Sequence, residues 1–129
     1  MNWPLLGVVM AGGALGAGAR HLLGAWLLRQ LGSGLPWGTL AVNLLGSFLA
    51  GFVVVWLQER GEAALLLRGF LVVGLLGGFT TYSALMLECL LYAREGRQGQ
   101  VLAYLALTLV VGLALVWAGA RLAQWLRPV

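Results

Sequence analysis

The sequence has no lysine and no aspartate, and it contains one cysteine and one histidine in 129 residues. A single cysteine, Cys89, excludes a disulfide within the chain. Cys89 and His21 together fall short of the three or four ligands that a zinc site requires. No Ser-His-Asp set, pair of catalytic carboxylates, P-loop lysine or dinucleotide-binding fingerprint is present, so the sequence gives no basis for an enzyme.

Charge is also scarce, because charged residues make up 9% of the chain and hydrophobic residues 61%. The mean hydropathy of +0.94 is that of an integral membrane protein. All basic residues are arginines, and they are scattered near segment ends instead of forming a patch, so no nucleic-acid partner is expected. The start of the chain lacks a basic region before its apolar run, and we expect a retained helix there, not a cleaved signal.

Apolar runs long enough to cross a bilayer fill nearly the whole chain. A spanning helix needs about 20 mostly apolar residues, and the runs that qualify are 3–28, 37–57, 63–92 and 101–125. The short breaks between them are rich in glycine, proline and charged residues. We therefore expect an all-α membrane protein, a single domain over residues 1–129, with four transmembrane helices embedded in the lipid bilayer.

The arginines are divided evenly between the two sides of the membrane. Cytoplasmic loops normally carry the excess of basic residues, but here each side has the same number: Arg60, Arg68, Arg121 and Arg127 on the side of the termini, and Arg20, Arg29, Arg94 and Arg97 on the other. Insertion in both orientations, which would permit an antiparallel dimer, is one interpretation. A chance balance with one orientation is the other.

The first span carries Gly12, Gly16 and Arg20 at intervals of one helical turn. Small residues at this spacing let two helix backbones approach closely in lipid, and we interpret the glycines as packing residues. The Arg20 guanidinium could gather anions at a pore mouth or extend toward the interface, and extension is the simpler expectation.

Polar side chains form stripes on two further spans. Asn43 and Ser47 share a face of the second span, and Tyr104 and Thr108 share a face of the fourth, each pair one turn apart. An amide without a partner costs several kcal/mol in a medium that cannot hydrogen-bond. Each stripe alone fits interhelical bonding as well as pore lining, but two stripes favour a polar pathway.

Weak helix formers occupy the middle of the third span, where Gly77-Gly78 is followed by Phe79-Thr80-Thr81. A break at this depth is tolerated only where the freed backbone groups are buried in protein or bind something. We expect Gly78 and Thr81 to mark such a break, and a continuous helix packed through its glycines is the alternative.

Glu88 is the only carboxylate within the spans, and it lies near the end of the third. Proton-coupled exporters usually need an acidic residue at mid-membrane. The remaining polar groups are neutral hydrogen-bond donors, which can replace part of the water shell of a small anion without trapping it.

Three segments, 12–20, 38–48 and 77–83, resemble the motifs of one family, the CrcB/Fluc fluoride channels. The resemblance follows the order and spacing of all four spans. It implies a channel that exports fluoride passively across the inner membrane, with two pores along the interface of a dual-topology, antiparallel homodimer. It also implies a structural sodium ion at the interface, held by backbone carbonyls of Gly77 and Thr80.

The residues that the resemblance assigns to the fluoride pathway come from all four spans. Arg20 would stand at a vestibule, and the pore residues would be Asn43, Tyr82, Ser83, Tyr104 and Thr108.

The sequence departs from the family at Tyr82 and Leu85, where two phenylalanines are typical. An aromatic ring edge is electropositive and can attract an anion, but the aliphatic side chain of Leu85 has no ring. A subunit that needs a non-identical partner is therefore one alternative to the homodimer. The others are a dual-topology exporter of the small multidrug-resistance type and a membrane subunit that transports nothing.

Overall fold

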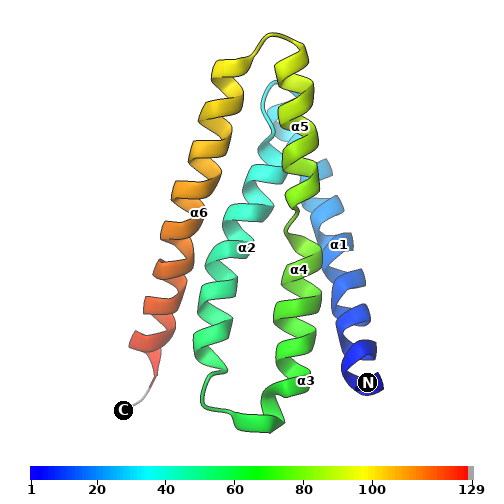
Figure 1. Cartoon of the computed structure of the whole chain (residues 1–129), viewed down its shortest axis with the longest axis vertical. Helices are drawn as coiled ribbons and strands as arrows, with labels where there is room; N and C mark the ends of the chain where they lie inside the picture. The colour runs from blue at the N-terminus through cyan, green and yellow to red at the C-terminus, as the bar shows by residue number, and fades with distance from the viewer. Residues whose placement is uncertain (128–129) are drawn as a thin grey trace.

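The computed structural model describes residues 1–127 and consists of helices joined by short loops. Four helical stretches are long and apolar enough to cross a membrane. They run up and down in sequence order, so that the start of the first span and the end of the fourth lie at the same end of the molecule (Figure 1). The first, second and fourth spans are α1 (Trp3–Leu31), α2 (Trp37–Trp56) and α6 (Gln98–Leu126).

The third span is divided into several segments. It begins with a 3-10 turn, η1 (Gly61–Ala64), and the short α3 (Leu65–Arg68), and continues through a π-helix, η2 (Gly69–Leu76). One further turn, α4 (Gly77–Phe79), precedes a break, after which α5 (Tyr82–Arg94) completes the crossing. The expectation of four spans with a broken third helix is confirmed.

Three of the four spans extend beyond the apolar runs from which they were predicted, whereas α2 ends at Trp56, one residue before its predicted end. α1 continues to Leu31, three residues past the expected end, and stops where Gly32 adopts a φ of 76°. At its start, the Asn2 side chain accepts a hydrogen bond from the Leu5 amide (3.0 Å). Hydropathy detects the part of a helix that lies in hydrocarbon, whereas capping residues decide where the helix ends.

Glycines bring α1 into close contact with the first half of the third span. A methyl group added at Gly12 or Gly16 would clash with the carbonyl oxygens of Phe70 and Leu75, respectively. In the reverse direction, a methyl group at Gly78 would lie 2.5 Å from the Gly13 carbonyl oxygen. The interpretation of Gly12 and Gly16 as packing residues is confirmed.

We call such a line of close glycine contacts a glycine seam. The first joins α1 to the third span, and a second joins α2 to α6. Methyl groups at Gly51 and Gly119 would clash with the carbonyl oxygens of Val116 and Phe48, respectively. The two seams divide the chain into a pair formed by α1 with η2 and α4, and a pair formed by α2 with α6. In lipid, where apolar side chains gain little from leaving the solvent, this close backbone contact is a main source of helix association.

The break falls at Thr80 and Thr81, which are both extended (φ −84°, ψ 155° and φ −149°, ψ 119°). Gly77 and Gly78 belong to the helical turn α4. The prediction that Gly78 marks the break is therefore wrong, because its missing side chain serves the contact with α1. Low helix propensity weakens this region, but it does not decide which peptide unwinds.

Candidate functional site

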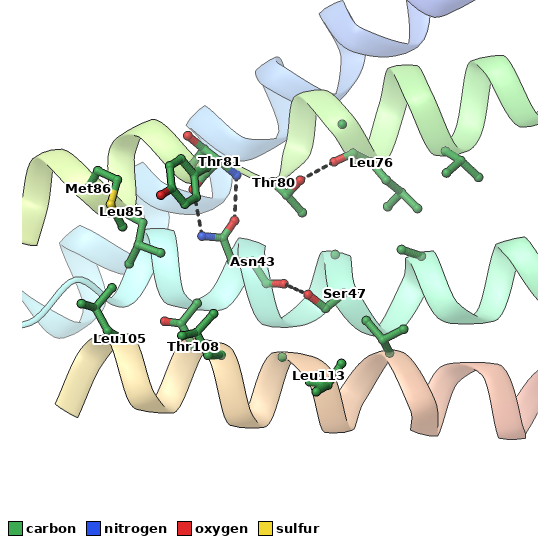
Figure 2. Close-up of a pocket in the computed structure, with 18 residues that line it drawn as sticks. Asn43, Ser47, Leu76, Thr80, Thr81, Leu85, Met86, Leu105, Thr108 and Leu113 are labelled. Carbon is green, nitrogen blue, oxygen red and sulfur yellow. Dashed lines mark hydrogen bonds between the residues drawn. The ribbon is translucent and has the colours of Figure 1, made fainter. Parts of the chain in front are cut away.

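The side-chain amide of Asn43, on α2, pairs with the backbone at the break. The Thr81 amide donates to Asn43 Oδ1 (2.7 Å), and Asn43 Nδ2 donates to the Thr81 carbonyl (3.0 Å), as Figure 2 shows. The carboxamide thus satisfies both polar groups of one extended residue, as a neighbouring strand would. The second N–H of Nδ2 is not used in this pairing.

The threonine hydroxyls complete the two helix ends that meet at the break. Thr80 Oγ1 donates to the Leu76 carbonyl (2.9 Å), and Thr81 Oγ1 accepts from the Ala84 amide (3.3 Å) at the start of α5. Threonine is a preferred N-cap residue because its oxygen takes up one of the amides that a helix start leaves free. The break is therefore stabilised by its own two residues and by α2.

Arg20 binds the last helical turn before the break. Its Nε donates to the Gly78 carbonyl (3.1 Å), and its side chain is partly buried. The expectation that Arg20 extends toward the interface is wrong, because the last turn of α4 offers carbonyl oxygens without helical partners. A fixed positive charge consequently stands beside the break.

The carbonyl of Gly77 loses its usual donor at this point. In a continuous helix the Thr81 amide would bind the Gly77 carbonyl, but here that amide donates to Asn43. Gly77 and Thr80 both line the open groove described next. The two residues whose carbonyls were predicted to bind an ion therefore both lie at the groove, next to the break.

A groove with a volume of about 870 Å³ runs between α2, the third span and α6. Its walls are mostly apolar, and the predicted residues that line it are Asn43, Gly77, Thr80, Thr81, Tyr82 and Thr108. In Figure 2, Asn43 and Thr108 approach the groove from different helices near the break. The structure thus brings six of the predicted residues to one surface.

Two hydroxyl groups in this groove differ in their bonding. Ser47 Oγ donates to the Asn43 carbonyl on its own helix (2.6 Å). Thr108 Oγ1 is buried and has no hydrogen-bond partner among the described residues. A buried hydroxyl without a partner costs free energy, so Thr108 is the polar group in the groove that has most to gain from a ligand.

Two predicted pore residues lie elsewhere. Ser83 is exposed and does not contribute to the groove among the described residues. Tyr104 is buried, and its hydroxyl donates to Glu88 Oε2 (2.8 Å). Tyr104 and Thr108 therefore share a helix face in sequence but point to different surroundings in the structure.

Glu88 is held between the helices by two hydroxyl groups. Thr39 Oγ1 donates to Glu88 Oε1, and Tyr104 donates to the other carboxylate oxygen. Sequence reasoning missed Thr39, although it lies one turn before Asn43 on the same face of α2. That spacing was the available signal for a longer polar stripe.

Tyr82 and Leu85 both line the groove but differ in exposure. Tyr82 has 76% of its surface exposed and lies at the groove. Leu85 is 5% exposed; it borders the groove as well, and it packs in a core cluster with Cys89 and Tyr104. An aromatic side chain is thus present at the open surface, and an aliphatic one closes the interior behind it.

A second cavity, of about 320 Å³, lies between α1, the start of α2 and the start of α5. Its lining includes Arg20, His21, Thr39 and Thr81. Among the described residues, Thr81 is the only one that borders both this cavity and the groove. The break is therefore the wall that the two cavities share.

Comparison with known proteins agrees with the sequence motifs. Residues 7–120 match the family profile described as CrcB-like protein, Camphor Resistance. A protein from Xanthomonas euvesicatoria is 56% identical over 124 residues (96% of this chain and 93% of its own), and one from Xylella fastidiosa is 53% identical over 120 residues (93% and 84%). A protein from Agrobacterium fabrum is 43% identical over 119 residues (92% and 95%).

Each of these three relatives is named a fluoride-specific ion channel, FluC, so they are channels and not enzymes. With a match over most of its length and relatives above 50% identity, this chain belongs to the CrcB family.

Proposed function

We propose that the protein is a fluoride-selective channel that lets fluoride leave the cell passively across the inner membrane. Its relatives are named fluoride channels. The observation that carries the proposal is the position of Asn43, whose amide pairs with Thr81 in the wall between the groove and the second cavity. A neutral amide at such a point can contact a passing anion without holding it.

The chemistry of the groove suits a small anion with a strong water shell. The free hydroxyl of Thr108 and the second N–H of Asn43 are neutral donors, and no described residue that lines the groove is charged. Each donor replaces one water molecule, and the absence of a full charge keeps the anion mobile. In this proposal Tyr82 adds a ring edge and a hydroxyl to the same path.

The proposed active form is an antiparallel homodimer in which the open groove faces a second copy and two pores follow the interface. The groove's apolar walls and the exposed Tyr82 support a partner at this surface. The even distribution of arginines supports insertion in both orientations. A non-identical partner is the alternative, and Tyr82 and Leu85 are the residues that favour it.

We further propose that a sodium ion stabilises this interface through the Gly77 and Thr80 carbonyls. Oxygen ligands suit a hard cation, and the diversion of the Thr81 amide to Asn43 leaves the Gly77 carbonyl without its helical donor, so the residues present fit the ion. When bound, sodium would supply a positive charge that joins the carbonyls of the two breaks.

The test is ion efflux from liposomes that contain the purified protein. We expect fluoride efflux without chloride efflux and without a proton gradient. Exchange of a cationic drug for protons would instead support an exporter, and no flux of any kind would support a subunit that transports nothing; either result would overturn the channel.

A substitution at Thr108 tests which groups carry the ion. Thr108→Val keeps the shape of the side chain and removes its unpaired hydroxyl. We expect fluoride efflux to fall about tenfold, while the free energy of unfolding stays equal or rises by about 1 kcal/mol, because the buried hydroxyl has no partner to lose. Ser47→Ala is the matched control, since that hydroxyl bonds only to its own helix. Equal efflux from wild type and Thr108→Val would remove Thr108 from the pathway.

A further inference from the structure

The break leaves backbone carbonyls of the third span without their helical donors. In a continuous α-helix, each carbonyl accepts from the amide four residues later. The Thr81 amide donates to Asn43 instead of to the Gly77 carbonyl. The Ala84 amide donates to the Thr81 hydroxyl instead of to the Thr80 carbonyl. Both carbonyls that are proposed to bind sodium have therefore lost their helical donors.

The carbonyl between these two, that of Gly78, is taken up by a charged side chain. Arg20 Nε donates to it from α1 (3.1 Å). Hydrogen bonds from a charged donor are about twice as strong as those between neutral groups. Within residues 1–127, no other charged side chain bonds to the segment 77–81. Arg20 is thus the one ionic anchor of the break in this part of the chain.

Arg20 and the proposed sodium ligands lie on different sides of the break. In the described part of the chain, Gly77 and Thr80 line the groove, whereas Arg20 lines the second cavity and not the groove. Gly78 faces α1, since a methyl group there would lie 2.5 Å from the Gly13 carbonyl oxygen. The guanidinium therefore holds the last turn of α4 from the side away from the groove.

The turn that carries these carbonyls needs an anchor outside the third span. α4 is only three residues long, contains two glycines, and lies between the π-helix η2 and the break. Glycine leaves the backbone more conformational freedom than any other residue. The amide and the hydroxyl of Thr80 both donate to the Leu76 carbonyl, which fixes the break only from within its own span. Arg20 adds a connection to α1.

On the basis of the proposed sodium site, we propose that Arg20 is a positioning residue for that site. By holding the Gly78 carbonyl, it keeps the Gly77 and Thr80 carbonyls in the arrangement that binds the ion. Removal of a group that orients metal ligands commonly lowers metal affinity by a factor of about 10 to 100. A charge that acted only by repulsion would have the opposite effect, because its removal would strengthen a cation site. The sign of the change in sodium affinity separates the two.

The experiment follows the midpoint of thermal unfolding of the purified protein in detergent, while sodium chloride replaces N-methylglucamine chloride at constant ionic strength. An ion that binds only the folded protein raises this midpoint. Arg20→Met keeps the apolar stem of the side chain and removes the donor and the charge. We expect this variant to need at least about tenfold more sodium than the wild type for the same rise.

Two further substitutions of Arg20 sharpen the result. Arg20→Lys should return the sodium response to within about threefold of the wild type, because a single bond to a carbonyl does not use the fork of the guanidinium. Arg20→Gln also removes the charge and should weaken the sodium response, so it gives the same comparison if methionine lowers the yield of folded protein.

Arg29→Met is the matched control. Arg29 lies in the last turn of α1, nine positions and roughly 14 Å along the axis from Arg20. The variant removes the same charge at a distance from the break, and it should keep the sodium response of the wild type.

A merely structural role of Arg20 would lower the midpoint in sodium-free buffer and leave the sodium concentration for half of the rise unchanged. An unchanged or lower concentration in Arg20→Met would therefore overturn the proposal. A wild-type midpoint that does not respond to sodium would overturn the sodium site and this role of Arg20 with it. Fluoride efflux from liposomes with the wild-type protein measures the channel function separately, so the two failures are distinguishable.

Discussion

The glycine pair and the threonine pair of the third span are adjacent in sequence but differ in structure. Gly77 and Gly78 have the lower helix propensity, yet they are helical, whereas Thr80 and Thr81 are extended. The difference lies in the available partners. Gly78 needs a helix to pack against Gly13, while the backbone of Thr81 finds both its partners in Asn43. In a membrane, a helix unwinds where its free backbone groups can be satisfied.

The largest expected effect comes from the glycine pair itself. Gly78→Ala would place a methyl group 2.5 Å from the Gly13 carbonyl, so α1 must move away from α4. We expect a loss of about 3 kcal/mol, the cost of overpacking a tight contact, measured as a lower midpoint of thermal unfolding in detergent. Gly77→Ala is the matched control, because its methyl group would have no neighbour closer than 3.8 Å. Equal unfolding midpoints for the two variants would contradict the packing role of Gly78.

The next largest effect is expected from removing the Asn43 side chain, which pairs with the break. Asn43→Ala leaves the Thr81 amide and carbonyl without their side-chain partner. We expect a loss of about 2 kcal/mol, because two partly buried backbone groups become unsatisfied, and a strong reduction of fluoride efflux with the proposed dimer preserved. Size-exclusion chromatography reports the dimer, and the liposome assay reports efflux. Efflux at the wild-type rate would remove Asn43 from the pore.

The smallest effect separates the two threonines. Thr81→Val keeps the branched shape but removes the N-cap of α5, which should cost about 1 kcal/mol. Thr80→Val, the control, removes the hydroxyl bond to Leu76, whose carbonyl still accepts from the Thr80 amide, and should cost less. Unfolding in detergent measures both. A larger loss for Thr80→Val would mean that the cap contributes less than the bond to α4.

The number and order of the spans could be predicted because hydropathy over about 20 residues depends on the sequence alone. The break was predicted in the right region, correctly at Thr81 and wrongly at Gly78, since propensity locates weakness and tertiary partners locate unwinding. Gly12 and Gly16 were interpreted correctly because their spacing already implies a close helix contact.

The bonds of the charged residues could not be predicted in the same way. Arg20 binds a carbonyl 58 positions away, and Glu88 joins Thr39 to Tyr104 from three different helices. No local sequence pattern predicts these hydrogen bonds, because they depend on how the two glycine seams orient the helices. Tyr104 was assigned to the same path as Thr108 because the two residues share a face of one helix. One helix face is wide enough for Tyr104 to turn toward Glu88 while Thr108 turns toward the groove.

The shared position of Thr81 has an electrical consequence. Where water fills the groove and the second cavity, each is nearly equipotential with the solution at its own mouth. In the proposed channel, a membrane voltage would then fall mainly across the partition formed by Thr81 and its partner Asn43. Each elementary charge moved across the full voltage is worth about 2.3 kcal/mol per 100 mV, and the part of that work done at this partition would exceed its small share of the membrane thickness.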